Sequence, residues 1–207
     1  MASQVICISR TIGAGGEEIG RAAAKELGFR YADEEIIIRA AEMAGVSPDT
    51  VAQVERTPGL VTRILEAMAR TPPDPEGWSA TAMMLTDSAP NYEGLIERVV
   101  RQTAEDGEVV IVAHGASLPL AGVSGLLRVL ITASADLRTE RLARAAGLGA
   151  AAAKKAVRES DRQRRDYLRR FYDVRQELPT HYDLVINTDV MTVPAAVQLL
   201  VTAAQSA

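Results

Sequence analysis

Five apolar runs alternate with helix-like segments along this chain of 207 residues. Most residues in these runs are apolar on both sides of the backbone, which is typical of strands in a parallel sheet covered by helices. The runs cover residues 4–9, 29–31, 108–113, 127–133 and 182–187. Helical patterns fall between them, at 17–28, 34–44, 94–106, 136–147, 150–172 and 192–204. The alternation predicts βαβ units and an α/β fold with a doubly wound parallel sheet.

The stretch between the second and third predicted strands, residues 45–93, carries the weakest sheet pattern. Ser47 followed by Pro48 predicts a helix start, because Ser caps the first turn and Pro fits the first helical position. Three prolines in "TPPDPEG" predict a surface loop further on. We therefore predict a mostly helical insertion at 45–93.

Composition and charge narrow the class of protein. Apolar residues make up 47% of the chain and charged residues 24%, and the formal net charge is −4. This charge argues against a general nucleic-acid binder. No apolar stretch approaches the roughly 18 residues of a membrane span, and the short N-terminal run lacks the basic flank of a signal peptide. We therefore expect a cytoplasmic protein in which Cys7, the single cysteine, is a buried and inert thiol.

A glycine-rich loop, "SRTIGAGGEEIG", joins the first predicted strand to the first predicted helix. This is the place of a P-loop, whose pattern is GxxxxGK[ST]. With Gly15 as the second glycine of that pattern, the first glycine falls on Arg10, the lysine on Gly16 and the Ser/Thr on Glu17. Gly13, Gly15 and Gly16 still allow backbone N–H groups to approach an anion at a helix N-terminus. The loop therefore predicts phosphate binding by the main chain.

Two acidic residues, Glu17 and Glu18, open the helix that follows this loop. A carboxylate about 4 Å from a phosphate charge is repelled by roughly 4 kcal/mol at an effective dielectric of about 20. Glu17 must therefore point away, share a metal with the phosphate, or weaken triphosphate binding. Two alternatives stay open: a purely structural turn whose acids stabilise the helix start, and a dinucleotide site in which Asp33 follows Gly13 by twenty residues.

An arginine-rich helical segment, residues 151–176, is the densest charged feature of the chain. From Lys154 to Arg175 it contains nine Lys or Arg against four Asp or Glu. Arginine has a planar fork that suits phosphate oxygens and stays charged. Such a helix can supply the cations that the glycine loop lacks, and the alternative is a solvated, salt-bridged helix face.

Together these segments resemble the cytidylate kinase-like family of the P-loop nucleoside monophosphate kinases. "ISRTIGAGGEEIGRAAAKELGF" is similar to the family's opening, which typically also lacks the P-loop lysine, and "YADEEIIIRAA" to the segment after its second strand. "SDRQRRDYLRRFY" and "YDLVINT" are similar to its lid helix and last strand. The resemblance implies a P-loop NTPase-like α/β/α fold with parallel sheet order 2-3-1-4-5. It also implies a core at 1–44, 94–146 and 176–207, an acceptor-binding insertion at 45–93 and a lid at 147–175.

The resemblance implies a role for each matching residue. The donor phosphates would be held by Arg10, Gly13, Ala14, Gly15, Gly16, Glu17 and Glu18. Asp33 would lie near the metal or the acceptor phosphoryl group, and the acceptor would be bound by Arg39, His114 and Gly115. The lid cations that stabilise the moving phosphoryl group would be Arg158, Arg162, Arg164 and Arg165. Asn187 and Thr188 would line the adenine site.

Some of these residues also have purely structural interpretations. Asp33 is a candidate N-cap for the helix that starts near Glu34, and both of its roles can hold together. Arg39 is equally well a solvated helix residue. His114 stands where the family has an arginine, and a packed loop residue is its alternative.

We therefore expect an ATP- and Mg²⁺-dependent kinase that acts on a nucleoside monophosphate such as CMP or dCMP, or on a related small phosphate acceptor. Its partners would be small nucleotides, with neither nucleic acid nor a membrane, and the sequence leaves the oligomeric state open, a homodimer included. One alternative is a catalytically weak or inactive nucleotide sensor of the same fold. The other is an NAD-type oxidoreductase.

Overall fold

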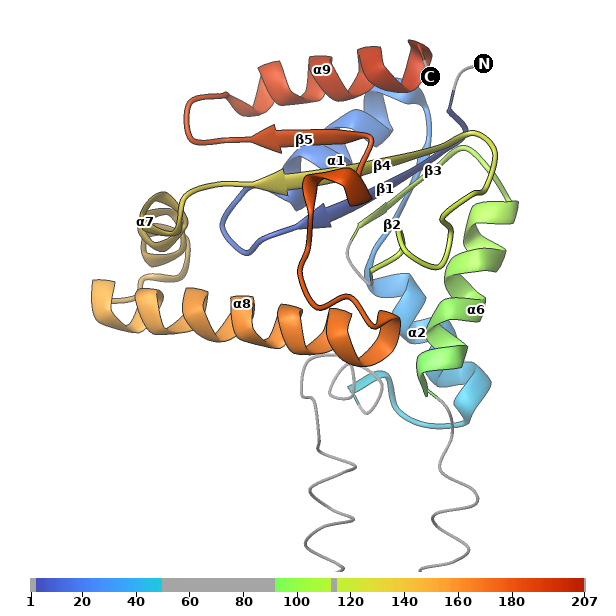
Figure 1. Ribbon diagram of the computed structural model, residues 1–207, viewed down its shortest axis with the longest axis horizontal. Coiled ribbons are helices and arrows are strands. Elements are labelled where there is room, and N and C mark those ends of the chain that lie inside the picture. The colour runs from blue at the N-terminus through green and yellow to red at the C-terminus, as the bar shows by residue number, and fades with distance from the viewer. Residues whose placement is uncertain (1–2, 50–91, 113–114, 207) are drawn as a thin grey trace, which may run out of the picture.

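A five-stranded parallel sheet forms the centre of the molecule (Figure 1). The computed structural model describes residues 3–49, 92–112 and 115–206. The strand order is β2-β3-β1-β4-β5, which confirms the predicted order 2-3-1-4-5. The strands are β1 (Val5–Arg10), β2 (Arg30–Ala32), β3 (Val109–Val112), β4 (Leu126–Thr132) and β5 (Leu184–Asn187).

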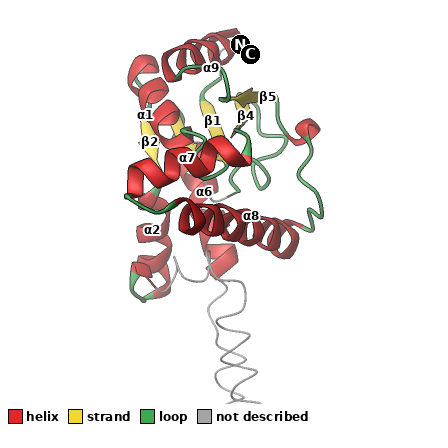
Figure 2. Cartoon of the chain, turned by 90° about the vertical axis from the view of Figure 1, so that its left-hand side faces the viewer, coloured by secondary structure: helices red, strands yellow, loops and turns green. Residues whose placement is uncertain are grey.

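Helices cover both faces of the sheet, as the apolar strands predict. α1 and α9 lie on one face, and α2 and α6 on the other (Figure 1). α7 lies beyond the end of the sheet where the strands finish, and α8 runs beneath the sheet (Figure 1). α7 crosses in front of the strand ends in Figure 2. The helices are α1 (Gly16–Leu27), α2 (Glu34–Ala44), α6 (Tyr92–Glu105), α7 (Ala135–Ala146), α8 (Ala150–Tyr172) and α9 (Val193–Ser206).

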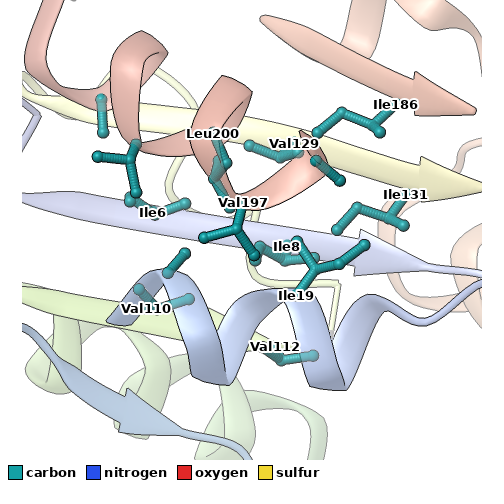
Figure 3. Close-up of a cluster of buried hydrophobic side chains, with 14 of the residues drawn as sticks. Ile6, Ile8, Ile19, Val110, Val112, Val129, Ile131, Ile186, Val197 and Leu200 are labelled. Carbon is teal, nitrogen blue, oxygen red and sulfur yellow. The ribbon is translucent and has the colours of Figure 1, made fainter. Parts of the chain in front are cut away.

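Alternate residues of each strand enter two separate cores. Ile6 and Ile8 of β1 pack with Ile19 of α1 and Leu200 of α9 (Figure 3). The intervening residues, such as Cys7, point to the opposite core, beneath α2 and α6. Cys7 is buried, and burial raises the pKa of its thiol well above the ordinary value. The prediction that Cys7 is buried is thereby confirmed, and that its thiol is inert stays a prediction.

The last strand is shorter than predicted at its beginning. The sequence predicts a strand from 182, but β5 starts at Leu184. A short 3₁₀ turn, Pro179–His181, ends by bonding the Tyr182 amide to the Pro179 carbonyl. Tyr182 therefore belongs to the turn, and β5 begins only at Leu184.

The predicted insertion falls almost wholly outside the described residues. α2 ends at Gly45, whose φ of 66° suits glycine, and residues 48–49 are helical, as Ser47-Pro48 predicts. The division into core, insertion and lid stays a prediction. Within residues 3–49, 92–112 and 115–206, no helix is both long and apolar enough to cross a bilayer.

The close packing of α1 on the sheet depends on Gly20. A Cβ at this position would lie 2.9 Å from Val112 Cγ2 and 3.1 Å from Ile8 Cδ1. Replacing an interior helical glycine by alanine normally stabilises a helix by about 1 kcal/mol. Here we expect Gly20→Ala to lower the free energy of unfolding by about 1–3 kcal/mol, because overpacking outweighs helix propensity.

Urea unfolding followed by circular dichroism would test this expectation. Gly149→Ala is the control, since Gly149 has φ −64° and no described atom within 4 Å of a built Cβ. A Gly20→Ala protein as stable as the wild type would show that α1 has room to move away from the sheet.

Candidate functional site

The glycine loop connects the end of β1 to the start of α1, as the sequence predicts. Gly13 and Gly15 have φ of 79° and 83°, which side chains other than glycine rarely adopt. A Cβ on Gly13 would lie only 2.8 Å from the carbonyl oxygen of Arg138 in α7. Glycine at 13 therefore serves both the turn and the close approach of α7.

Two side chains hold the carbonyl groups of this loop. Thr188, just after β5, donates from its hydroxyl to the Ala14 carbonyl oxygen over 2.9 Å. Arg141 of α7 donates to the Gly13 carbonyl at 3.4 Å and to the Thr188 hydroxyl and carbonyl at 2.9 and 2.8 Å. Because C=O and N–H point in opposite directions across a trans peptide, the Gly15 amide faces away from Thr188. The brace thereby fixes the direction of a loop N–H group.

The first turn of α1 adds further amide donors to the loop. Gly15 occupies the N-cap position and offers no side-chain cap. The N–H groups of the first helical residues have no partner within their own helix, and they lie at its positive end. The turn and the helix start together offer several N–H donors to an anion.

An ion pair lies directly beside these amides. Arg10 Nε is 2.5 Å from Glu17 Oε1, and the two side chains are 26% and 42% exposed. Glu17 therefore partners the arginine at the end of β1. The carboxylate that threatens phosphate binding is thus neutralised by a neighbouring cation.

A cleft of about 510 Å³ opens beside the loop. It lies between the loop, α7 and the start of α9, and it combines backbone and polar groups with apolar side chains. Its lining residues are Gly13, Ala14, Gly15, Glu17, Glu18, Arg141, Leu142, Ala145, Thr188, Met191, Thr192 and Val193. A mixed wall of this kind suits a ligand with an apolar ring and a charged end.

Arg164 of α8 is half-buried in a cluster of polar groups under the sheet. Its Nε donates to Glu177 Oε2 at 2.9 Å, and its Nη2 donates to Glu177 Oε1 at 2.5 Å and to Ser9 Oγ at 3.1 Å. Tyr182 also donates its hydroxyl to Glu177, and burial raises the pKa of Tyr182 to about 12. Burial opposes both charges, but their mutual attraction prevails. The pKa of Glu177 therefore lies below its ordinary value, and the pKa of Arg164 lies above.

A second arginine, which is buried, ties α7 to α8. Arg138 is 5% exposed and donates from Nε to the Ala133 carbonyl at 3.0 Å. Its two Nη atoms each donate to Asp161 over 2.8 Å, a bidentate pair. Asp161 therefore positions the start of α7, whose main chain touches Gly13.

The remaining lid cations lie on an exposed side of α8. Arg158, Arg162 and Arg165 are exposed, and Arg162 pairs with Glu159 at 2.7 Å. A groove of about 460 Å³ runs along this side, lined by Ala151, Lys154, Lys155, Arg158, Glu159 and Arg162. The structure thus separates Arg164, which is enclosed and paired, from the other predicted lid arginines.

The predicted acceptor residues lie on the β2 and β3 side of the loop. Asp33 occupies the N-cap position of α2, as its structural interpretation predicts, although its side chain makes no capping hydrogen bond. Tyr31 donates its hydroxyl to Asp33 at 3.3 Å. Burial first, and then the charge of Asp33, raise the pKa of Tyr31 to about 12. Arg39 donates to Thr103 of α6 at 3.3 Å.

Gly115 follows β3, and its φ of 59° and the nearby rings of Tyr167 and Tyr172 leave no room for a side chain. A Cβ there would lie 2.8 Å from Tyr172 and 3.1 Å from Tyr167. Gly115 is therefore a packing position for the end of α8. The prediction for His114 lies outside the described residues.

The sequence analysis does not identify three residues that shape the site, namely Arg138, Arg141 and Glu177. Arg138 and Arg141 are three residues apart on α7, so the sequence places them on one helix face. This three-residue spacing on α7 is a weaker sequence pattern than the local charge excess of α8. Glu177 lies in a turn-rich segment with no motif, and only the fold brings it to Arg164.

The half-buried Arg164–Glu177 pair predicts a specific pH dependence of stability. A carboxyl whose pKa is lowered by folding stabilises the protein above its unfolded value of 4.5, and this contribution is lost as pH falls through the lower folded value. We expect Glu177→Gln to cost about 2 kcal/mol at pH 7, because the half-buried Arg164 loses its charged hydrogen-bond partner. The difference between wild type and variant should shrink as pH falls below 4.5.

Urea unfolding between pH 3 and pH 7 measures that difference. Glu159→Gln is the matched control, because it removes an exposed ion pair on α8, the helix that carries Arg164. This variant should change the free energy of unfolding little. A Glu177→Gln deficit that stays constant down to pH 3 would contradict the proposed origin of the effect.

Comparison with known proteins places this geometry in a family. The model of the cytidylate kinase-like family matches residues 5–190. No curated protein sequence matches the chain significantly. Among solved structures, an uncharacterized protein from Eubacterium ventriosum superposes with a TM-score of 0.67 at 16% identity, over 98% of this chain and 99% of that one.

Shikimate kinases share the fold. The enzyme from Bacteroides thetaiotaomicron gives a TM-score of 0.51 at 14% identity, over 96% of this chain and 97% of its own. The enzyme from Acinetobacter baumannii, solved in complex with shikimate, gives 0.52 at 11% identity, over 100% and 94%. These likenesses show a P-loop kinase fold, and the family match supports nucleotide-dependent phosphoryl transfer in general. The chain belongs to the cytidylate kinase-like family.

Proposed function

We propose that this protein transfers a phosphoryl group from ATP to a nucleoside monophosphate such as CMP or dCMP, or to a related small phosphate acceptor. The observation that carries the proposal is the braced glycine turn. It offers main-chain N–H groups to an anion, next to a cleft with room for a nucleotide, in a member of a kinase-like family. Phosphoryl transfer requires positioning and charge neutralisation more than covalent chemistry.

In this proposal the donor nucleotide lies in the 510 Å³ cleft. The phosphates contact the amides of Gly13 to Glu18, and Arg10 lies beside them. The base packs among Leu142, Met191 and Val193, with Thr188 and Thr192 as polar neighbours. Arg141 and Thr188 act as positioning residues, because they hold the loop carbonyls rather than the phosphates.

Mg²⁺ fits the chemistry of the site as a nucleotide-bound ion. Within the described residues, no group of three His, Cys, Asp or Glu side chains could hold a metal. Mg²⁺ commonly needs only one or two carboxylates when phosphate oxygens and waters complete its shell. Asp33 is the proposed carboxylate. When bound, the ion would neutralise charge on the phosphates.

The acceptor and the lid complete the proposal. Arg39, Asp33, His114 and Gly115 would surround the acceptor phosphate. Arg158, Arg162 and Arg165 have exposed guanidinium groups that could reach a transferred phosphoryl group. Arg164 already satisfies Glu177 and Ser9, so we assign it to holding α8 beneath the loop.

An acceptor screen tests the proposed reaction. With ATP and Mg²⁺, we expect ADP to form only when a suitable monophosphate or other small phosphate acceptor is present. Arg158→Ala should lower kcat by about tenfold or more, because a charge-neutralising group is lost. Arg101→Ala is the control, since Arg101 pairs with Glu97 on the surface of α6.

Two results would contradict the proposal and identify the alternatives. Thermal stabilisation by nucleotides, with no ADP formed over the whole acceptor panel, would indicate a binding protein without turnover. Tight binding of NAD(H) in place of ATP would indicate an oxidoreductase.

The loop brace makes a separate prediction about the donor. Thr188→Val removes the hydroxyl that holds the Ala14 carbonyl, so the loop amides lose their fixed direction. We expect the KM for ATP to rise about tenfold, the size of one lost hydrogen bond to a buried group. Thr188→Ser should retain the wild-type KM. A Thr188→Val enzyme with unchanged KM would show that the loop holds its shape without the brace.

A further inference from the structure

The side chain of Arg10 occupies the space that a side chain on Gly16 would need. A Cβ built on Gly16 would lie 2.6 Å from Arg10 Cβ and 3.2 Å from both Cγ and Cδ. A contact below 3.0 Å with a Cβ atom cannot be relieved without moving the chain. Glycine at 16 is therefore required by the arginine at 10.

These are two of the three positions at which the loop departs from the pattern GxxxxGK[ST]; the third is Glu17. The pattern has its first glycine where this chain has Arg10, and its lysine where this chain has Gly16. The cation and the glycine have therefore exchanged places, and the arginine stem crosses the site from which the lysine would extend. The exchange keeps one cation and one glycine at the start of α1.

Arg10 has a charged partner, Glu17, but the geometry between them is not that of a hydrogen bond. Its Nε lies 2.5 Å from Glu17 Oε1, yet it has no aligned hydrogen bond among the described residues. Glu17 itself lines the cleft beside Gly13 and Gly15. A phosphate group that reaches the loop amides would therefore meet the Arg10–Glu17 pair at the same place.

We propose that Arg10 replaces the missing P-loop lysine as the cation for the donor phosphates, and that Glu17 is its resting partner. This inference rests on the proposed function and names the residue that binds the donor's phosphates. The ligand class is a nucleoside diphosphate or triphosphate. Such a ligand carries more negative charge than one carboxylate and matches the arginine fork, so it displaces Glu17 from Arg10.

The alternative is that the pair only stabilises the start of α1. Partly exposed ion pairs contribute little to stability, and acidic residues are common at helix N-termini. That structural role predicts effects on unfolding alone. The proposed role predicts effects on nucleotide affinity that depend on which of positions 10 and 16 carries the cation.

Restoring the usual pattern tests the exchange directly. Isothermal titration of ADP with Mg²⁺ would compare the wild type, Arg10→Gly, Gly16→Lys and the double variant. Arg10→Gly should weaken binding about 30-fold, the value of a charged hydrogen bond. Gly16→Lys alone should also weaken binding, because its Cβ collides with Arg10. The double variant should return to within about threefold of the wild type, a large non-additivity that distant sites do not show.

Two milder variants keep the test independent of folding defects. Arg10→Lys should bind ADP within about fivefold of the wild type, because it keeps a cation at the site. Glu17→Gln should bind ADP about fivefold more tightly, because the competing carboxylate is gone. This gain should be the same with Mg²⁺ and with EDTA. Arg101→Ala serves again as the charge-matched control.

Each other outcome overturns the inference. Unchanged ADP affinity in Arg10→Gly, or no recovery in a double variant that unfolds at the wild-type temperature, would show that Arg10 does not take the lysine's place. A gain in Glu17→Gln seen only with EDTA would make Glu17 a ligand of the nucleotide's metal rather than a competitor. If the wild type binds neither ADP nor ATP, the proposed function fails together with this inference.

Discussion

The close approach of the glycine loop to α7 and to the end of β5 is the constraint on which the site depends. Gly13 lies against the main chain of Arg138, and the Ala14 carbonyl accepts the Thr188 hydroxyl from 174 residues further along the chain. Both contacts require β4 to pair with β1 and β5 to pair with β4, on the side of β1 away from β3. The sheet order thus determines the direction of the loop's N–H groups, and any anion-binding chemistry follows from that.

Charge pairing is the second feature that shapes the site. Arg138 pairs with Asp161, Arg164 with Glu177, and Arg10 with Glu17, while Arg141 donates to loop and strand carbonyls. The arginines nearest the loop therefore each have a protein partner, although the Arg10–Glu17 pair lacks an aligned hydrogen bond at Arg10 Nε. A phosphate ligand must displace an acid, as we infer for Glu17, or use the exposed arginines of α8. We therefore assign the enclosed, paired arginines to holding the helices in place, and the exposed arginines of α8 to contacting a phosphoryl group.

The sequence predicts the fold well because the fold depends on patterns that are local. Apolar runs on both faces predict a covered parallel sheet, and the glycine loop lies at the first β–α turn as expected. The strand order followed from the family resemblance and is confirmed. The boundaries of most elements differ from the prediction by one or two residues, and at Tyr182 the cause is a local turn that competes with strand pairing.

The site is less predictable because its contacts join distant segments. A count of charges identifies the arginine helix but cannot say that Arg164 pairs with Glu177 in a half-buried position while Arg158 is exposed. The space shared by Arg10 and Gly16 depends on how a strand end meets a helix start, which no motif encodes. Arg141 and Thr188 belong to different elements, so their joint hold on the loop appears only in three dimensions.

The most direct test of the account is amide spectroscopy of the loop during titration with ADP and Mg²⁺. In ¹⁵N-labelled protein, the account predicts that the amide signals of Gly13, Gly15 and Gly16 shift first and furthest, in proportion to the bound fraction. Saturable ADP binding that leaves these three signals unmoved, while amides elsewhere respond, would contradict the claim that this loop holds the donor phosphates.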